Sequence, residues 1–409
     1  MRPSSSSRCQ RLLYLTYQEN ILGSGILHTQ VVGMLECLAS LSGIQSVTLL
    51  SYMSPQLLWR ERRGFKDLRQ RLAARGIRLI RLPMIVPGRA KLLWWLPFML
   101  WALPTFIVAL ITRCQVLHAR SYPAAVLAWA ATRLIRAEFV FDPRGPFPDE
   151  MVMNDIWKEG SLTHRWWRRI EDLLIASAGA VVGVTPEYRD EYRGRGARRA
   201  VFVPNRTDAQ PFIQAARKAQ LPERKLSGEG CELLFTGELH SVWNDPALVG
   251  WHFQALRRRY PGFRLRMITS ARTDQAERAL RELGVDLSRV TFESHRPADM
   301  PGAVQGAALG LIFKTKPIHS VWMVKMAEYL AAGIPILADR TMVGLPLQII
   351  LKRRLGVQAD PDRPEDYAAV DDIITNWQAW SDRCREYAAK RLDISSTARQ
   401  HLRIYRRLV

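Results

Sequence analysis

The sequence has little cysteine, and its cysteines are not arranged to build a site. Five cysteines, an odd number, lie far apart in the 409 residues, at Cys9, Cys37, Cys114, Cys231 and Cys384. No two of them have the spacing of metal ligands or of a redox pair. We therefore predict reduced thiols and a cytoplasmic protein.

Other absences exclude further classes of protein. Glycine and proline follow no collagen-like period, and the chain has no internal repeat. The sequence contains no zinc-finger spacing, no aromatic RNA-binding pattern and no basic region that leads into heptads, so nucleic acid is not an expected partner. The opening residues, MRPSSSSRCQRLLYLTYQ, lack the apolar core of a secretory signal peptide.

Acidic residues are scarce compared with basic ones. Asp and Glu total 38 against 59 Lys and Arg, which gives a net charge of +21 and a pI near 10.3. Such a charge favours anionic partners, either a membrane surface or phosphorylated substrates. Residues 59–82 and 164–174 mix Arg with Trp and Leu, as helices on an anionic bilayer do, although a solvated basic face has the same composition. We predict peripheral attachment to the inner face of the cytoplasmic membrane.

One long apolar run could be mistaken for a membrane span. Leu92–Ile111 is nearly uniformly apolar and has cationic residues at both ends. Its length is close to the roughly 20 residues of a spanning helix. Pro97 and Pro104 interrupt it, however, and another apolar strand begins near Val116. The run is therefore predicted to be either a helix that dips into the membrane interface or a plain core helix.

Short apolar runs alternate with helical stretches along the whole chain, which indicates parallel sheets covered on both faces. The predicted strands are 11–17, 46–52, 77–82, 115–119, 138–142, 180–185, 200–204, 232–237, 263–269, 290–294, 309–313, 334–339 and 356–360. The pattern weakens in the polar segment 206–230. We predict an N-terminal Rossmann-like domain at 1–205, a linker at 206–230, a second Rossmann-like domain at 231–376, and C-terminal helices at 377–409 that cross back to the first domain. The last of these helices is predicted to start after a cap at Ser395 or Ser396.

The stretch KMAEYLAAG, from Lys325 to Gly333, follows the predicted strand 309–313 and a loop. It is predicted to be a helix whose first turn lies at the carboxyl edge of the sheet, where free amides bind anions. Lys325 adds a positive charge suited to a pyrophosphate, and Glu328 is placed to accept hydrogen bonds from hydroxyls such as those of a ribose. A surface Lys325–Glu328 ion pair is the alternative interpretation.

This block, continued through IPILAD to VGLP, resembles the motif of retaining GT-B glycosyltransferases of glycosyltransferase family 4. The segments VLHARSY, FDPRGPFPDE, VVGVTPEY, VFVPNRTD and LLFTGELHSVW occur in that family's order, so the resemblance covers almost the whole chain. It implies an α/β GT-B fold: two Rossmann-like, doubly wound parallel-sheet domains that face each other across a cleft. It also implies transfer of a sugar from a nucleotide-diphosphate donor with retention, without an essential metal or a cofactor.

The resemblance assigns residues to the donor in the second domain. Glu328 matches the glutamate that holds the donor's ribose, while Lys325 and the loop at 320–322 lie on the phosphate side. Ser320 stands where many members carry a further glutamate, eight positions before Glu328, which normally touches the donor sugar. The expected donor-binding residues are Gly237, Ser320, Val321, Lys325, Glu328 and Gly344.

The first domain is expected to hold the acceptor. His118 matches a family histidine near the transferred sugar, where it would act with Glu328 in catalysis; a lone histidine in an apolar strand is otherwise a core residue. Arg144 could bind an acceptor phosphate or pair with a nearby carboxylate. The expected acceptor-binding residues are Gly23, Ser24, Gly25, Arg120, Ser121 and Arg144.

The predicted activity is sugar transfer to a glycan or lipid-linked acceptor in bacterial surface polysaccharide synthesis. The replacement at Ser320 keeps open a catalytically impaired binding or assembly subunit, and a nucleotide-sugar epimerase is a further alternative. The triplet Asp360–Asp362 matches the metal-binding motif of the other large glycosyltransferase fold, but it lies in a Pro-rich loop typical of a solvated turn.

Overall fold

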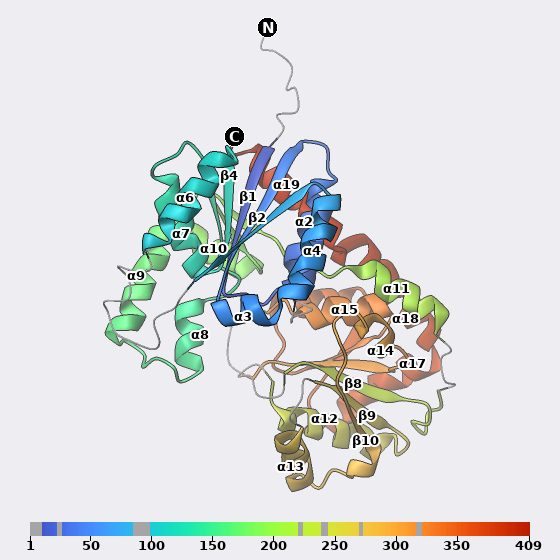
Figure 1. Ribbon diagram of the computed structural model, residues 1–409. Helices are drawn as coiled ribbons and strands as arrows, with labels where there is room; N and C mark the ends of the chain where they lie inside the picture. Colours follow the sequence, from blue (N-terminus) through green and yellow to red (C-terminus); the bar gives the residue numbers. More distant parts are fainter. Residues whose placement is uncertain are drawn as a thin grey trace. The chain divides into compact units, whose positions relative to one another are not determined.

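The chain divides into two compact units, each built around its own parallel sheet (Figure 1). The computed structural model describes residues 10–22, 27–84, 99–219, 224–238, 244–269, 273–315 and 321–409. Unit 1 comprises Met1–Pro204 and Ile394–Val409, and unit 2 comprises Asn205–Asp393. Residues 394–409 therefore group with the first unit rather than with the segment that precedes them.

The sheet of unit 1 has seven parallel strands in the order β3-β2-β1-β4-β5-β6-β7. The strands are β1 (Gln10–Tyr17), β2 (Ile44–Met53), β3 (Ile77–Pro83), β4 (Val116–Arg120), β5 (Glu138–Asp142), β6 (Ala180–Gly183) and β7 (Ala200–Phe202). Every residue of β4 is buried, because helices cover both faces of the sheet.

Alternation along the strands separates two cores. Leu117 and Ala119 of β4 point to one face, whereas Val116 and His118 point to the other. Helices α6 and α7 cover the first face, and α2, α4 and α19 cover the second (Figure 1). The helices of unit 1 are the π-helix η1 (His28–Gly33), α2 (Met34–Ala39), α3 (Pro55–Arg60), α4 (Arg62–Ala74), α6 (Ala102–Ile111), α7 (Tyr122–Thr132), α8 (Phe147–Met153), α9 (Leu162–Ser177), α10 (Pro186–Gly194) and α19 (Ile394–Arg406).

The sheet of unit 2 has six parallel strands in the order β10-β9-β8-β11-β12-β13. The strands are β8 (Glu232–Thr236), β9 (Arg264–Ile268), β10 (Val290–Glu293), β11 (Leu309–Ile312), β12 (Ile336–Asp339) and β13 (Gly356–Ala359). Its helices are α11 (Ala209–Lys218), α12 (Pro246–Arg259), α13 (Asp274–Glu282), η3 (Leu287–Arg289), α14 (Met300–Ala303), α15 (Val324–Ala332), α16 (Gly344–Lys352), η4 (Pro364–Ala369), α17 (Val370–Thr375), α18 (Trp377–Tyr387) and the π-helix η5 (Ala388–Leu392).

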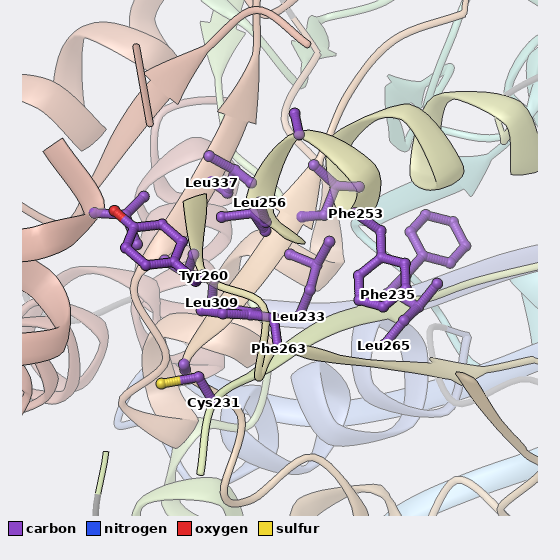
Figure 2. Close-up of a cluster of buried hydrophobic side chains, with 14 of the residues drawn as sticks. Cys231, Leu233, Phe235, Phe253, Leu256, Tyr260, Phe263, Leu265, Leu309 and Leu337 are labelled. Carbon is purple, nitrogen blue, oxygen red and sulfur yellow. The ribbon is translucent and has the colours of Figure 1, made fainter. Parts of the chain in front are cut away.

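The main core of unit 2 lies between the sheet and α12. Figure 2 shows Leu233 and Phe235 of β8 packed with Phe253 and Leu256 of α12. The other face of the sheet is covered by α15, which also packs against α11, α18 and η5. The segment 206–230 thus contributes a packed helix, α11, to this unit.

The predicted fold class is confirmed, since each of the thirteen predicted strands overlaps an observed strand in one of two Rossmann-like parallel sheets. One local prediction is wrong. The last helix was expected to start after a cap at Ser395 or Ser396, but α19 begins at Ile394, so both serines lie in its first turn. Ile394 is buried in the core, and this packing sets the helix start in place of a serine cap.

The apolar run 92–111 is only partly described. Residues 92–98 lie outside the described residues, and 102–111 form α6. This helix buries Thr105 and Ala109 but exposes Leu103, Ile107 and Leu110, so it is not a plain core helix. Within the described part of the chain, no helix has both the length and the apolarity to cross a bilayer.

Candidate functional site

Helix α15 places the Lys325–Glu328 pair at the carboxyl edge of the sheet in unit 2. The helix follows β11, and the side chain of its cap residue, Met323, makes no hydrogen bond to the first amides. The hydroxyl of Tyr329 accepts a hydrogen bond of 2.8 Å from the Thr236 amide, which ties α15 to the end of β8. Gly310 is required beneath this contact, because any Cβ there would overlap the Tyr329 ring.

The Lys325 ammonium is held beside the end of β8. Its Nζ donates to Asn244 Oδ1 at 3.2 Å and lies 4.2 Å from the centroid of the Phe235 ring. Gly237 makes this approach possible: its φ of +144° is a glycine conformation, and a Cβ there would lie 3.2 Å from Nζ. Burial lowers the pKa of Lys325 to about 7, and the charge of Glu328 opposes that shift.

The Glu328 carboxylate has no hydrogen bond or ion pair with any described residue, Lys325 included, although the two lie one helical turn apart. The predicted alternative of a surface Lys325–Glu328 ion pair is therefore not what the structure contains. Burial raises the pKa of Glu328 to about 7, and Lys325 opposes the rise. A partly buried carboxylate without a partner is costly, and hydroxyl donors from a ligand would offset that cost.

The other expected donor residues are placed only in part. Gly344 begins α16 with a φ of +76°, at the carboxyl end of β12, on the same sheet edge as α15. Thr341, in the loop before it, accepts a hydrogen bond of 2.9 Å from the Lys314 amide and so joins the loops after β11 and β12. Val321 is half-buried just before α15, and Ser320 lies outside the described residues.

In unit 1, Arg120 and Arg144 meet at the carboxyl ends of β4 and β5. Arg120 and Asp142 are register partners, and both arginines donate to Gln30 Oε1. Arg120 Nε donates to both oxygens of Glu19, at 2.9 and 3.1 Å. The Arg120 Nη1 atom is buried without a partner among the described residues. These two cations and two carboxylates form a compact ionic cluster.

The side chains of Arg120 and Arg144 differ in solvent exposure. Arg120 is almost fully buried, whereas the side chain of Arg144 is 21% exposed and also donates to Asp142 Oδ2 at 3.4 Å. Burial would raise the pKa of Asp142, but the charge of Arg144, the hydrogen bond with His118 and the charge of Arg120 together hold it well below its usual value. Asp142 is thus a permanent anion that positions Arg144.

His118 is fully buried on the α19 face of the sheet. Its Nδ1 lies 2.8 Å from the Tyr405 hydroxyl, its Nε2 lies 3.5 Å from Asp142 Oδ2, and its ring stacks on Tyr14 at 4.6 Å. Burial lowers the pKa of His118, so the ring is neutral at pH 7. These contacts favour the core-residue interpretation, and the expected contact between His118 and a sugar stays a prediction.

Ser121 directly follows β4 with a φ of +72°, and its amide donates to the Asp142 carbonyl at 2.9 Å. It therefore lies beside Arg120 and Arg144, as expected from the sequence. The remaining acceptor candidates, Gly23, Ser24 and Gly25, lie outside the described residues.

Sequence reasoning missed several partners of these groups. Glu19 could have been found, because it is an acidic residue immediately after the first predicted strand. Gln30, Asn244 and Tyr405 carry no local signal, since only the fold brings them to Arg120, Lys325 and His118. No group of His, Cys, Asp or Glu in the described ranges could hold a metal ion. Asp360 and Asp362 pair with Arg340 in a turn after β13.

Comparison with protein families gives one match. Residues 27–206 match the family model described as "Glycosyl transferase 4-like domain". This match covers β2 to β7 and every described helix of unit 1 except α19, and it includes Arg120 and Arg144. No curated protein sequence matches the chain.

Comparison with solved structures supports the fold of both units. The chain is similar to Anabaena HepE in complex with UDP and glucose, with a TM-score of 0.60, 15% identity, and coverage of 96% of this chain and 98% of that one. A glycosyltransferase from Rickettsia africae gives a TM-score of 0.65 at 14% identity over 98% of each chain. The lipopolysaccharide outer core galactosyltransferase WaaB gives 0.60 at 13% identity, over 97% and 99%.

Proposed function

We propose that the protein is a retaining, metal-independent glycosyltransferase that moves a sugar from a nucleotide-diphosphate donor to a glycan or lipid-linked acceptor. The observation that carries this proposal is the Glu328 carboxylate, which is unpartnered in the described structure and has a pKa raised to about 7 beside Lys325. Such a carboxylate can accept hydrogen bonds from the hydroxyl groups of a ligand. The family match in unit 1 and the structural similarity to proteins that bind UDP and UDP-glucose support the same conclusion.

The donor would bind at the carboxyl edge of the unit 2 sheet. Glu328 would accept hydrogen bonds from the ribose hydroxyls, and Lys325 with the first amides of α15 would hold the diphosphate. Because the pKa of Lys325 is lowered to about 7, an incoming diphosphate would recharge this ammonium. Asn244 and Gly237 fix its direction.

The transfer itself would proceed on the front face of the sugar. The acceptor oxygen forms the new bond to the anomeric carbon as the bond to the diphosphate oxygen breaks, and that leaving oxygen takes the acceptor's proton. Lys325 and the helix amides stabilise the charge that develops on the diphosphate. Arg144 is the more exposed of the two arginines in the cluster and would hold an anionic group of the acceptor, with Asp142 and Gln30 as its supports.

The chain would act in bacterial surface polysaccharide synthesis, peripherally on the inner face of the cytoplasmic membrane. The net charge of +21 favours an anionic surface. The exposed side chains Leu103, Ile107 and Leu110 of α6 offer an apolar face for the same purpose. Of the two Trp and Arg segments, Trp59 is 71% exposed, whereas Trp167 of α9 is buried against Tyr122 and belongs to the core.

The proposal is tested by turnover. A thermal-shift screen of nucleotides and nucleotide sugars identifies the donor, because a ligand that binds only the folded chain raises its melting temperature. We expect slow hydrolysis of that donor, which Glu328→Ala abolishes and Glu282→Ala, an exposed glutamate on α13, does not. Donor binding without turnover for any acceptor would indicate a binding subunit, and a changed sugar without an acceptor would indicate an epimerase.

A further inference from the structure

A polar cavity lies in unit 2, and neither Lys325 nor Glu328 lines it. Its volume is about 280 Å³, and its lining residues are Arg353, Leu355, Arg383, Glu386, Tyr387, Lys390 and Arg391. Leu355 directly precedes β13, so the cavity opens at the amino edge of the sheet. Helix α15 starts after the carboxyl end of β11, and β11, β12 and β13 are parallel. The two sites therefore lie at opposite edges of one sheet.

The cavity is lined by four cations and a single carboxylate, and that carboxylate is already used. Glu386 forms an ion pair with Lys390, one turn away. Arg383 stacks on Trp380 at 4.7 Å and donates to the Arg354 carbonyl at 3.3 Å. Apart from Lys390, the cations that line the cavity therefore have no carboxylate partner there.

Arg353 and Arg391 are the decisive pair. Neither guanidinium has an ion pair or a hydrogen bond with any residue in the described ranges. They come from different elements, since Arg353 ends α16 and Arg391 belongs to η5. Asp393, two positions after Arg391, accepts a hydrogen bond from the Ala209 amide, and Asp382 of α18 is paired with Arg385. The fold thus brings two uncompensated cations to one hollow.

Tyr387, the last residue of α18, lines the same cavity. Burial raises the pKa of its hydroxyl, while the charges of Arg391, Arg353 and Arg206 oppose that rise. The hydroxyl is therefore a neutral hydrogen-bond donor at pH 7 and is near enough to both arginines for their charges to act on it. The chain continues directly into the π-helix η5, a rare element that is frequent at functional sites.

Converging like charges repel one another, and an anion that binds among them removes that cost. A hollow lined by one sign of charge also concentrates counter-ions. The planar guanidinium forks of two arginines suit the oxygens of a phosphate, and a tyrosine hydroxyl supplies one further donor. A volume of about 280 Å³ equals about nine waters of liquid, at roughly 30 Å³ each, which is more than one phosphate group needs.

We propose that this cavity binds a phosphomonoester, with Arg353, Arg391 and Tyr387 around the phosphate. The same phosphate could belong to a soluble phosphorylated small molecule or to the headgroup of a phospholipid. This inference goes beyond the proposed glycosyl transfer and does not depend on it, because the site shares no residue with the Lys325–Glu328 pair.

The test measures binding to the full chain in two arms. In the first, sn-glycerol 3-phosphate is titrated calorimetrically. In the second, the protein is sedimented with phosphatidylcholine vesicles that contain phosphatidic acid. All proteins carry Lys325→Gln, so that the opposite edge of the sheet cannot supply the signal. The variants are Arg353→Gln with Arg391→Gln, Tyr387→Phe, and the control Arg258→Gln, which removes one charge from an exposed position on α12.

We expect the double arginine variant to weaken binding about tenfold or more, Tyr387→Phe to weaken it about threefold, and Arg258→Gln to leave it unchanged. Weaker binding of the cavity variants than of Arg258→Gln in the calorimetric arm identifies a soluble ligand. The same difference in the vesicle arm alone identifies a phospholipid headgroup. Tyr387→Phe removes only one hydroxyl and keeps the packing, so its result stands even if the double variant folds poorly. Equal behaviour of the pocket variants and Arg258→Gln in both arms, or no binding in either, would overturn the proposal.

Discussion

At the residue scale, the ionised form of Glu328 is suited to bind a ligand but lowers the stability of the folded chain. The folded chain holds a proton on Glu328 up to about pH 7, whereas an ordinary carboxyl releases it near 4.5. The folded state thus binds more protons than the unfolded state between these values, so stability falls as pH rises through this window. The contribution of this group is fully present below pH 4.5 and is lost above pH 7. Sites kept for ligands commonly carry such a cost.

Glu328→Gln should therefore stabilise the protein without nucleotide at pH 8. Glutamine keeps the shape of the side chain but cannot ionise, so we expect a gain of about 1 kcal/mol in the free energy of unfolding, a value reduced for partial exposure. At pH 5 the gain should be much smaller. Urea unfolding at the two pH values measures both, and a loss of stability at pH 8 would show that the carboxylate has partners that stabilise it.

His118 illustrates what a sequence motif leaves open. Its type and its place in the strand were predictable, but its partner Tyr405 is 287 positions away and reaches it only because α19 packs on unit 1. No local sequence pattern carries that information, because the contact forms only when the last helix, α19, joins the N-terminal unit. The same holds for Gln30, which a π-helix places between Arg120 and Arg144.

A structural role for His118 has a measurable consequence. His118→Ala should lower the free energy of unfolding by about 2–4 kcal/mol, because it leaves a cavity and removes one hydrogen-bond partner from each of Tyr405 and Asp142. Tyr405→Phe, which removes the hydroxyl contacts with His118 and His401, should cost about 1–2 kcal/mol. Thermal and urea unfolding give both values. A His118→Ala protein with unchanged stability and no transfer activity would instead favour direct contact with the substrate.

At the element scale, continuous apolar runs predicted every strand because strands buried on both faces leave little room for polar residues. Element ends were less predictable. The predicted strand 334–339 begins at Ile336 in the structure, since the turn after α15 takes Ile334 and Pro335. The start of α19 was wrong because packing of Ile394, and not a serine cap, determines it.

Helix α6 allows a test of the proposed membrane attachment. Leu103→Gln with Ile107→Gln should weaken binding to anionic vesicles about thirtyfold, because each of the two apolar side chains that inserts contributes about 1 kcal/mol. The control pair Leu226→Gln and Leu351→Gln removes exposed leucines from unit 2. Sedimentation with vesicles at low and high salt measures the effect. Binding that salt abolishes and that the α6 variants leave unchanged would assign attachment to the basic surface alone.

At the scale of the whole molecule, composition gave the basic charge, and the alternation of apolar runs with helical stretches predicted two α/β domains. The two parallel sheets confirm this fold class. The family match ends at residue 206, so the proposal of a donor site in unit 2 rests on the chemistry of that unit's own residues. Within unit 2, one sheet has a carboxylate and a cation at its carboxyl edge and a cluster of arginines at its amino edge. Ligand binding at the two edges can be tested with separate variants, because the two groups of residues do not overlap.

The most direct measurement is a calorimetric titration of the nucleotide sugar that stabilises the protein most into the natural chain and into Glu328→Ala. The account predicts that the substitution weakens binding by about 1.5–3 kcal/mol, the scale of charge-assisted hydrogen bonds, while Glu282→Ala binds as the natural chain does. Equal affinity of Glu328→Ala and the natural chain would contradict the placement of the donor at α15.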